Sequence, residues 1–196
     1  VKLAEGDEVI SMAILRGVDA TPAERAAYLK HARAMLRAAG EEGDDAPAPE
    51  EAEDDVDEAS LTPDRIAALG AAEEFILTVS TEGFGKRTSA YEFRRTGRGG
   101  QGLLAQDLTK KGKGGRLAAS FPVEEFDEIL LVTDQGQLIR TPVTQVRVIS
   151  RNTSGVTIFR TGKDEKVVSV ERIADEGDSE EGEAETGPAP EDSGEA

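Results

Sequence analysis

The sequence predicts an all-β chain built from repeated four-stranded units. Residues 76–83, an apolar run that ends at a glycine, match residues 129–136, and the 53-residue offset persists when 98–103 is placed on 151–156. Each unit reads as an apolar strand, a tight glycine turn, a return strand ending in Arg-Thr, a Gly-rich link and two further strands. Four strands in a period of about 50 residues are typical of propeller-like blades.

The repeat sets the expected domain boundaries. One blade spans residues 73–123 and a final blade spans 124–174, while residues 1–17 read as the end of a preceding blade, with a strand over 1–15. A single blade cannot cover its own apolar faces, so blades need neighbours. We therefore expect a partial disc, and we expect the chain, which opens on Val1, to be a piece of a longer protein.

Residues 18–72 interrupt the repeat and are predicted to be a helical and acidic insertion. Thr21–Glu24 has the pattern of a capping box and should start a helix that runs to about Ala39, with one narrow apolar stripe that predicts weak docking. Thr62 should cap a shorter helix that ends at Gly70. Residues 41–60 hold 11 acidic residues, and the tail at 175–196 holds 10 acidic residues and none that is basic. Both segments are expected to be disordered.

The composition excludes several classes of chemistry. The chain has no cysteine and one histidine, which removes disulfides, thiol catalysis and a transition-metal site. His31 lies in the insertion helix, where we expect a solvated side chain, and no serine or carboxylate pair has a base at a useful position. We therefore expect no catalytic residue, no metal and no cofactor in this chain. No apolar stretch reaches the roughly 20 residues of a membrane span.

Charge is distributed unevenly. The net charge is −17, yet residues 71–174 hold 16 basic and 13 acidic side chains, so a mildly basic body is joined to acidic segments. Two Gly-rich basic stretches, at 94–102 and 110–116, offer arginine forks and lysines to phosphate oxygens. A nucleotide-binding loop is disfavoured because neither GxGxxG nor a Walker lysine is present. Solvated hairpin loops are the simplest alternative. The candidate DNA-contacting residues are Arg87, Arg94, Arg95, Arg98, Lys110, Lys111, Lys113, Arg140 and Arg151.

Three motifs carry a resemblance to a known family. Residues 82–88 (EGFGKRT), 94–102 (RRTGRGGQG) and 149–156 (ISRNTSGV) resemble the last two blades of the C-terminal domain in the A subunit of bacterial DNA gyrase. The family's active-site tyrosine belongs to an earlier domain, and neither Tyr28 nor Tyr91 sits in its motif. The family's Gln-Arg-Arg-Gly-Gly-x-Gly box is also absent.

The resemblance implies a β-pinwheel whose basic rim wraps double-stranded DNA. It also implies a cytoplasmic, nucleoid-associated holoenzyme, an A2B2 heterotetramer with the gyrase B subunit, which uses ATP and Mg²⁺ elsewhere to introduce negative supercoils. The acidic tail would compete with DNA for the rim. Two alternatives remain open: the matching domain of topoisomerase IV, and a protein-interaction propeller whose acidic segments recruit basic partners.

Overall fold

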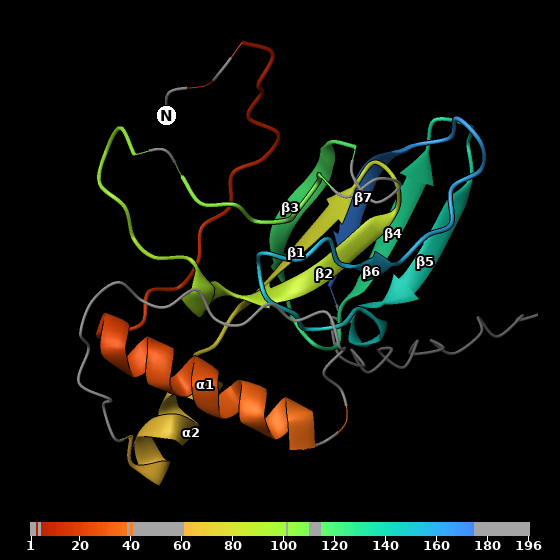
Figure 1. The fold of residues 1–196 in the computed structure, drawn as a ribbon. Helices are drawn as coiled ribbons and strands as arrows, with labels where there is room; N and C mark the ends of the chain where they lie inside the picture. The colour runs from red at the N-terminus through yellow and green to blue at the C-terminus, as the bar shows by residue number, and fades with distance from the viewer. Residues whose placement is uncertain are drawn as a thin grey trace, which may run out of the picture.

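The computed structural model describes residues 3, 5–38, 40, 61–100, 102–109 and 115–174. Figure 1 shows the strands gathered into two neighbouring sheets, with both helices beside one end of them. Short 3-10 helices follow the second strand of each repeat, η1 (Ala90–Glu92) and η2 (Val143–Gln145). The helices are α1 (Pro22–Ala38) and α2 (Pro63–Ala71), and the strands are β1 (Phe75–Ser80), β2 (Phe84–Ser89), β3 (Leu117–Val123), β4 (Glu128–Thr133), β5 (Leu138–Pro142), β6 (Val156–Thr157) and β7 (Val167–Ile173).

The two sheets repeat one antiparallel pattern. The first sheet has the order β3-β1-β2-β6 and the second the order β5-β4-β7. In the first, Phe75 pairs with Ser89, and in the second Glu128 pairs with Pro142, each position being displaced by 53 residues. A bulge interrupts the inner strand at the same place, at Val79 and at Val132. The predicted repeat and the blade architecture are therefore confirmed.

One strand crosses between the repeats. β6 belongs to the second repeat but pairs with β2 of the first, Val156 opposite Gly85. A parallel bridge joins Arg87 to Val148 on the same edge of β2. The second repeat thus completes the first sheet, whose four strands come from both repeats. Within the described residues, no strand pairs with the outer edge of β5.

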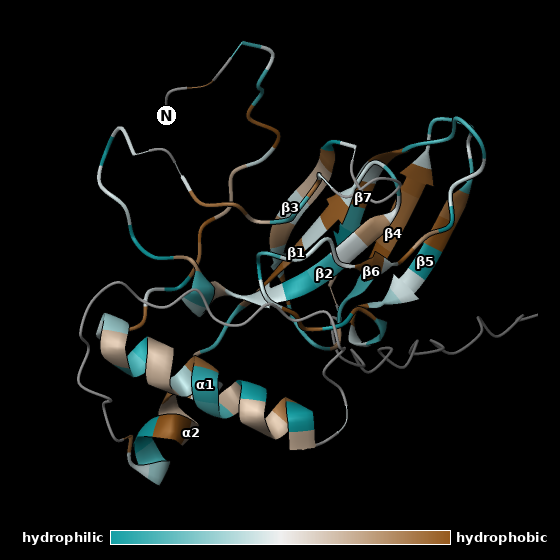
Figure 2. Ribbon diagram, viewed as in Figure 1, coloured by the Kyte–Doolittle hydropathy of each residue, from teal (hydrophilic) through white to brown (hydrophobic). Residues whose placement is uncertain are grey.

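The sheets share one hydrophobic core. Leu77 of β1 and Ile129 of β4 are both fully buried in it, and Figure 2 shows apolar residues along β1, β3 and β4, with polar ones along much of β2. Shared burial explains why a blade needs its neighbour, because each sheet covers an apolar face of the other. The core residues are Leu77, Val79, Ala119, Val123, Ile129, Leu131, Val143, Val146, Val167 and Val170.

The insertion docks through a residue outside its predicted apolar stripe. Thr21 and Glu24 form the expected capping box, with the Glu24 amide donating to Thr21 Oγ1 at 3.1 Å and the Thr21 amide donating to Glu24 Oε2 at 2.8 Å. Tyr28, which the predicted stripe left out, is 6% exposed and packs with Leu69 against Tyr91. One aromatic residue outside the predicted stripe thus anchors α1, and the strength of its docking stays a prediction. The acidic segments expected to be disordered, 41–60 and 175–196, lie outside the described residues.

The strand expected over residues 1–15 is not formed in the described part of that segment. Residues 5–15 carry no strand, and Met12 and Ile14 are 90% and 89% exposed. A strand needs a ladder of backbone hydrogen bonds to a neighbouring strand. This segment instead contacts the first blade through isolated hydrogen bonds, such as the one from Ser11 Oγ to the Ser120 carbonyl at 2.7 Å. Its place at the end of a preceding blade stays a prediction.

The two repeated turn glycines provide a matched stability test. Gly83 and Gly136 have φ of 76° and 80°, as predicted for turn residues, but a Cβ at Gly83 would overlap the Phe159 carbonyl oxygen, whereas one at Gly136 meets nothing within 4 Å. Gly136→Ala should lower the free energy of unfolding by about 1 kcal/mol through backbone strain alone. Gly83→Ala should lower the free energy of unfolding by at least about 2 kcal/mol more than Gly136→Ala does, because the backbone at Phe159, just after β6, must move. Urea denaturation measures both, and equal destabilisation by the two variants would contradict the packing of the exchanged strand.

Candidate nucleic-acid interface

The link that follows η1 presents three predicted arginines to solvent. Arg94, Arg95 and Arg98 are all exposed on a stretch without regular structure. Gly99 in this link and Gly102 beyond it have φ of 79° and 80°, which only glycine adopts without strain. An exposed, irregular link of this kind can bring guanidinium groups against a curved polyanion.

Glu92 fastens this link to a loop of the second repeat. Its Oε2 accepts hydrogen bonds from the Ser150 hydroxyl at 3.1 Å and the Arg151 amide at 2.9 Å. Its Oε1 pairs with Arg33 of α1 at 3.1 Å. The side chain of Glu92 is 9% exposed, so these charge-assisted bonds form largely out of water. One carboxylate therefore joins the arginine link, the second repeat and the insertion.

A buried lysine supports the same loop from below. Lys86 of β2 is fully buried, and its Nζ donates to the carbonyls of Ser150 at 2.7 Å and Thr153 at 2.9 Å, and to that of Arg151. An ammonium has three donors, so three carbonyls satisfy it without a carboxylate. Lys86 thus fixes the backbone of the loop that carries Arg151.

The buried position changes the acidity of Lys86. Burial lowers the pKa of Lys86 from 10.5 to about 7, while the nearby Glu92 carboxylate acts in the opposite direction and the Arg151 guanidinium lowers it further. Lys86 therefore carries its proton less readily in the folded chain than in the unfolded chain. The bonds to the three carbonyls favour the charged form, because a neutral amine has one donor fewer.

Two further contacts close the seam between the link and the loop. The Arg151 guanidinium donates from Nη1 to the Leu104 carbonyl at 3.2 Å. Gln106, 2% exposed, donates to the carbonyl of Ser154 at 2.8 Å and to that of Phe84 at 3.3 Å. Leu104 and Gln106, which follow the arginine link, are consequently bonded to the loop, and exposed Arg147 adds a further cation to that loop.

The remaining predicted site residues lie elsewhere. Arg87 is half-buried, donates from Nε to the Val146 carbonyl at 2.7 Å and lies over the Phe75 ring. Arg140 is exposed on β5 and forms an ion pair with Glu128. The structure therefore bonds the Arg151 loop to Glu92 and Leu104, which flank the link with Arg94, Arg95 and Arg98, but places Arg87 beside Val146 and Arg140 on the second sheet. Lys110, Lys111 and Lys113 lie outside the described residues.

Sequence reasoning missed the residues that position this surface. Lys86 looks like an ordinary strand lysine, and Glu92 like any carboxylate next to a basic run. The available signal was the pair Gly85 and Gly155, since a Cβ at Gly155 would overlap the Gly85 backbone, which indicates close contact between two chain segments.

The described residues contain no other candidate centre. They hold no cluster of three or more His, Cys, Asp or Glu side chains suited to a metal ion. His31 is exposed on α1, as expected. None of the helices described is long and apolar enough to span a bilayer.

The lowered pKa of Lys86 predicts a pH-dependent stability. Between pH 7 and 10.5 the unfolded chain binds the Lys86 proton more tightly than the folded chain, so the free energy of unfolding should rise with pH across this window. The slope contributed is at most about 1.4 kcal/mol per pH unit, and below the folded pKa it vanishes because both states are protonated.

Urea denaturation from about pH 6 to about pH 9 measures this slope. Lys86→Met should abolish it, and should also lower stability by about 1–3 kcal/mol because three carbonyls are left without their donor. A slope that is the same in both proteins would contradict a buried Lys86.

Comparisons with known proteins identify relatives with similar sequences. The DNA gyrase A subunit of Granulibacter bethesdensis is 52% identical over 188 residues, which cover 91% of this chain and 20% of that protein. The DNA gyrase A subunit of Rickettsia bellii is 44% identical over 187 residues, covering 94% and 19%. The chain thus spans about a fifth of the length of these curated relatives.

A solved structure and a family profile also match. The structure of a DNA gyrase A C-terminal domain is 26% identical, with a TM-score of 0.49, over 52% of this chain and 34% of that one. The profile described as DNA gyrase C-terminal domain, beta-propeller, matches residues 74–124 and 127–174, which are the two repeats. Since those matches make up half of its length, the chain belongs to the DNA gyrase C-terminal domain family.

Proposed function

We propose that the chain is a DNA-binding and DNA-wrapping module of the gyrase A subunit. The observation that carries this proposal is that the loop with Arg147 and Arg151 is bonded to both flanks of the exposed arginine link, to Glu92 before it and to Leu104 after it. Arginine forks bind phosphate oxygens in pairs. Contact with phosphates carries no sequence information, so binding of this kind is sequence-independent.

Wrapping follows from the repeat. If each blade presents cations at its rim, DNA that follows the rim meets new cations at successive blades. Smooth bending of a 20–30 base-pair segment costs of order 1–6 kcal/mol, which additional phosphate contacts offset. The two described blades, fixed to each other by β6 and a shared core, supply a rigid part of such a path.

The wider assembly belongs to the same proposal. An A2B2 complex with the gyrase B subunit would hydrolyse ATP with Mg²⁺ in other domains and use the wrapped DNA for negative supercoiling. This chain would contribute binding and no reacting group. We place it in the bacterial cytoplasm near the nucleoid. The relatives, which are DNA gyrase A subunits, support this interpretation over the topoisomerase IV alternative.

The arginine link makes a quantitative prediction about salt. Replacing Arg94, Arg95 and Arg98 together by alanine should weaken duplex binding and flatten the slope of log K against log salt. The expected change is about 0.9 for each phosphate that is no longer neutralised, or about 3 in all. Fluorescence anisotropy with a labelled duplex, at several salt concentrations, measures both quantities in the full-length protein that carries this chain.

The matched control replaces Arg16, Lys163 and Lys166, which are exposed cations outside the link and the loop. It removes the same charge and should change the slope little. Equal effects of the two triple variants would show that overall charge, not this surface, governs binding. The same titration without residues 175–196 tests competition by the acidic tail, which predicts tighter binding; unchanged affinity would dismiss it.

A further inference from the structure

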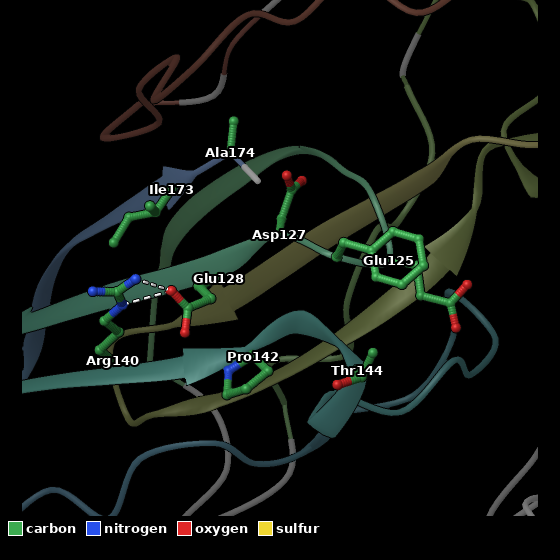
Figure 3. Close-up of a pocket in the computed structure, with 9 residues that line it drawn as sticks. Glu125, Asp127, Glu128, Arg140, Pro142, Thr144, Ile173 and Ala174 are labelled. Carbon is green, nitrogen blue, oxygen red and sulfur yellow. Dashed lines mark hydrogen bonds and ion pairs between the residues drawn. The ribbon is translucent and has the colours of Figure 1, made fainter. Parts of the chain in front are cut away.

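The second sheet has a hollow at the end where β4 begins and β5 and β7 end. It measures about 390 Å³, and Figure 3 shows Pro142 and Thr144 on one side of it and Ile173 and Ala174 on the other. Phe126 lines it and is 75% exposed, an unusual position for a large aromatic side chain. The DNA-binding proposal makes no use of this hollow.

The repeat relates this hollow to a site in the first sheet. The Val143 amide donates to the Asp127 carbonyl at 2.9 Å, and 53 residues earlier the Ala90 amide donates to the Glu74 carbonyl at 2.8 Å. The strand registers of the two sheets match at the same offset of 53 residues. Thr144 of the hollow therefore corresponds to Tyr91 of the first sheet. Phe126 corresponds in the same way to Glu73.

In the first sheet the corresponding site is covered by the insertion. Tyr28 of α1 packs edge-on against Tyr91, with ring centres 5.5 Å apart and an interplanar angle of 84°. Its hydroxyl donates to Glu73 at 2.7 Å, and the Tyr91 hydroxyl donates to the Leu69 carbonyl at 2.8 Å. Tyr28 and Leu69 are both buried there. A basic amphipathic helix and a second, short helix therefore complete the first site.

The second site has the same position in its blade but no such cover among the described residues. Thr144 is exposed, as is Phe126. Three carboxylates line the hollow: Asp127 is paired with Arg172 and Glu128 with Arg140, whereas Glu125 is exposed beside Phe126. An exposed aromatic side chain with an exposed carboxylate beside it favours a ligand with an apolar centre and a cation at its border.

We propose that this hollow docks an amphipathic helix of a partner protein, with an aromatic side chain over Phe126 and Lys or Arg toward Glu125. The first repeat shows this mode of cover: α1 brings Tyr28 to the centre and Arg33 to a carboxylate at the border. Polyanions such as the chain's own acidic tail or duplex DNA bring no cation to Glu125, so they are the poorer ligands.

The probe is a fluorescent peptide with the sequence of residues 19–40, which contains α1. The chain's own α1 already occupies the first site, so added peptide should bind saturably at the hollow of the full chain. Phe126→Ser should weaken binding about tenfold, in the range of an interface hot spot. Glu125→Lys should weaken it most at low salt. Because both residues are exposed, we expect neither substitution to change the thermal unfolding of the chain.

Val168→Ser is the matched control, because Val168 is 58% exposed and lies outside the lining of the hollow. This variant should bind the peptide as tightly as the unaltered chain does. A peptide with Tyr28→Ala should bind more weakly than the unaltered peptide to the chain and to each variant that keeps Phe126. The two peptides should bind equally to Phe126→Ser, which lacks the aromatic partner. Absence of saturable binding, or equal weakening by Phe126→Ser and Val168→Ser, would overturn the proposal.

Discussion

The coordination of the Lys86 ammonium by backbone carbonyls of the second repeat is the constraint on which the rest of the structure depends. A buried lysine amine without hydrogen-bond partners is unfavourable, and the 150–153 loop supplies those partners to Lys86 of the buried β2. β6 then pairs with β2, and the two sheets close over one core. This explains how a strand as polar as FGKRTS comes to lie inside the molecule.

The same seam connects the insertion to the cationic surface. Glu92 binds the Ser150–Arg151 backbone with one oxygen and Arg33 of α1 with the other. Docking of α1 through Arg33 and positioning of the Arg151 loop thus share the Glu92 carboxylate. An insertion that interrupts the blade pattern is in this way integrated into the blade, and it covers a site that the second blade leaves open.

Residues that repeat along the chain made much of this fold predictable. The 53-residue offset located β1, β2, β4 and β5, and glycines with positive φ marked their turns. The exchange of β6 escaped prediction, because local patterns do not specify which edge a two-residue strand joins. Tyr28 was missed because it lies outside the apolar stripe of its helix. The strand expected over residues 1–15 is not formed in the described part of that segment, where no neighbouring strand pairs with it. At the site, exposed arginines were visible in the sequence, whereas Lys86 and Glu92 act through contacts that only the fold creates.

The central claim is that contacts across the seam, and not charge alone, make the cationic surface. Glu92→Ala tests it most directly, because removing a carboxylate should tighten DNA binding if only net charge matters. We predict weaker duplex binding at constant salt, since the link and the loop are then without their common anchor. Arg33→Ala, which breaks only the contact with α1, should have the smaller effect. Tighter binding by Glu92→Ala, in a protein that remains folded, would contradict the account.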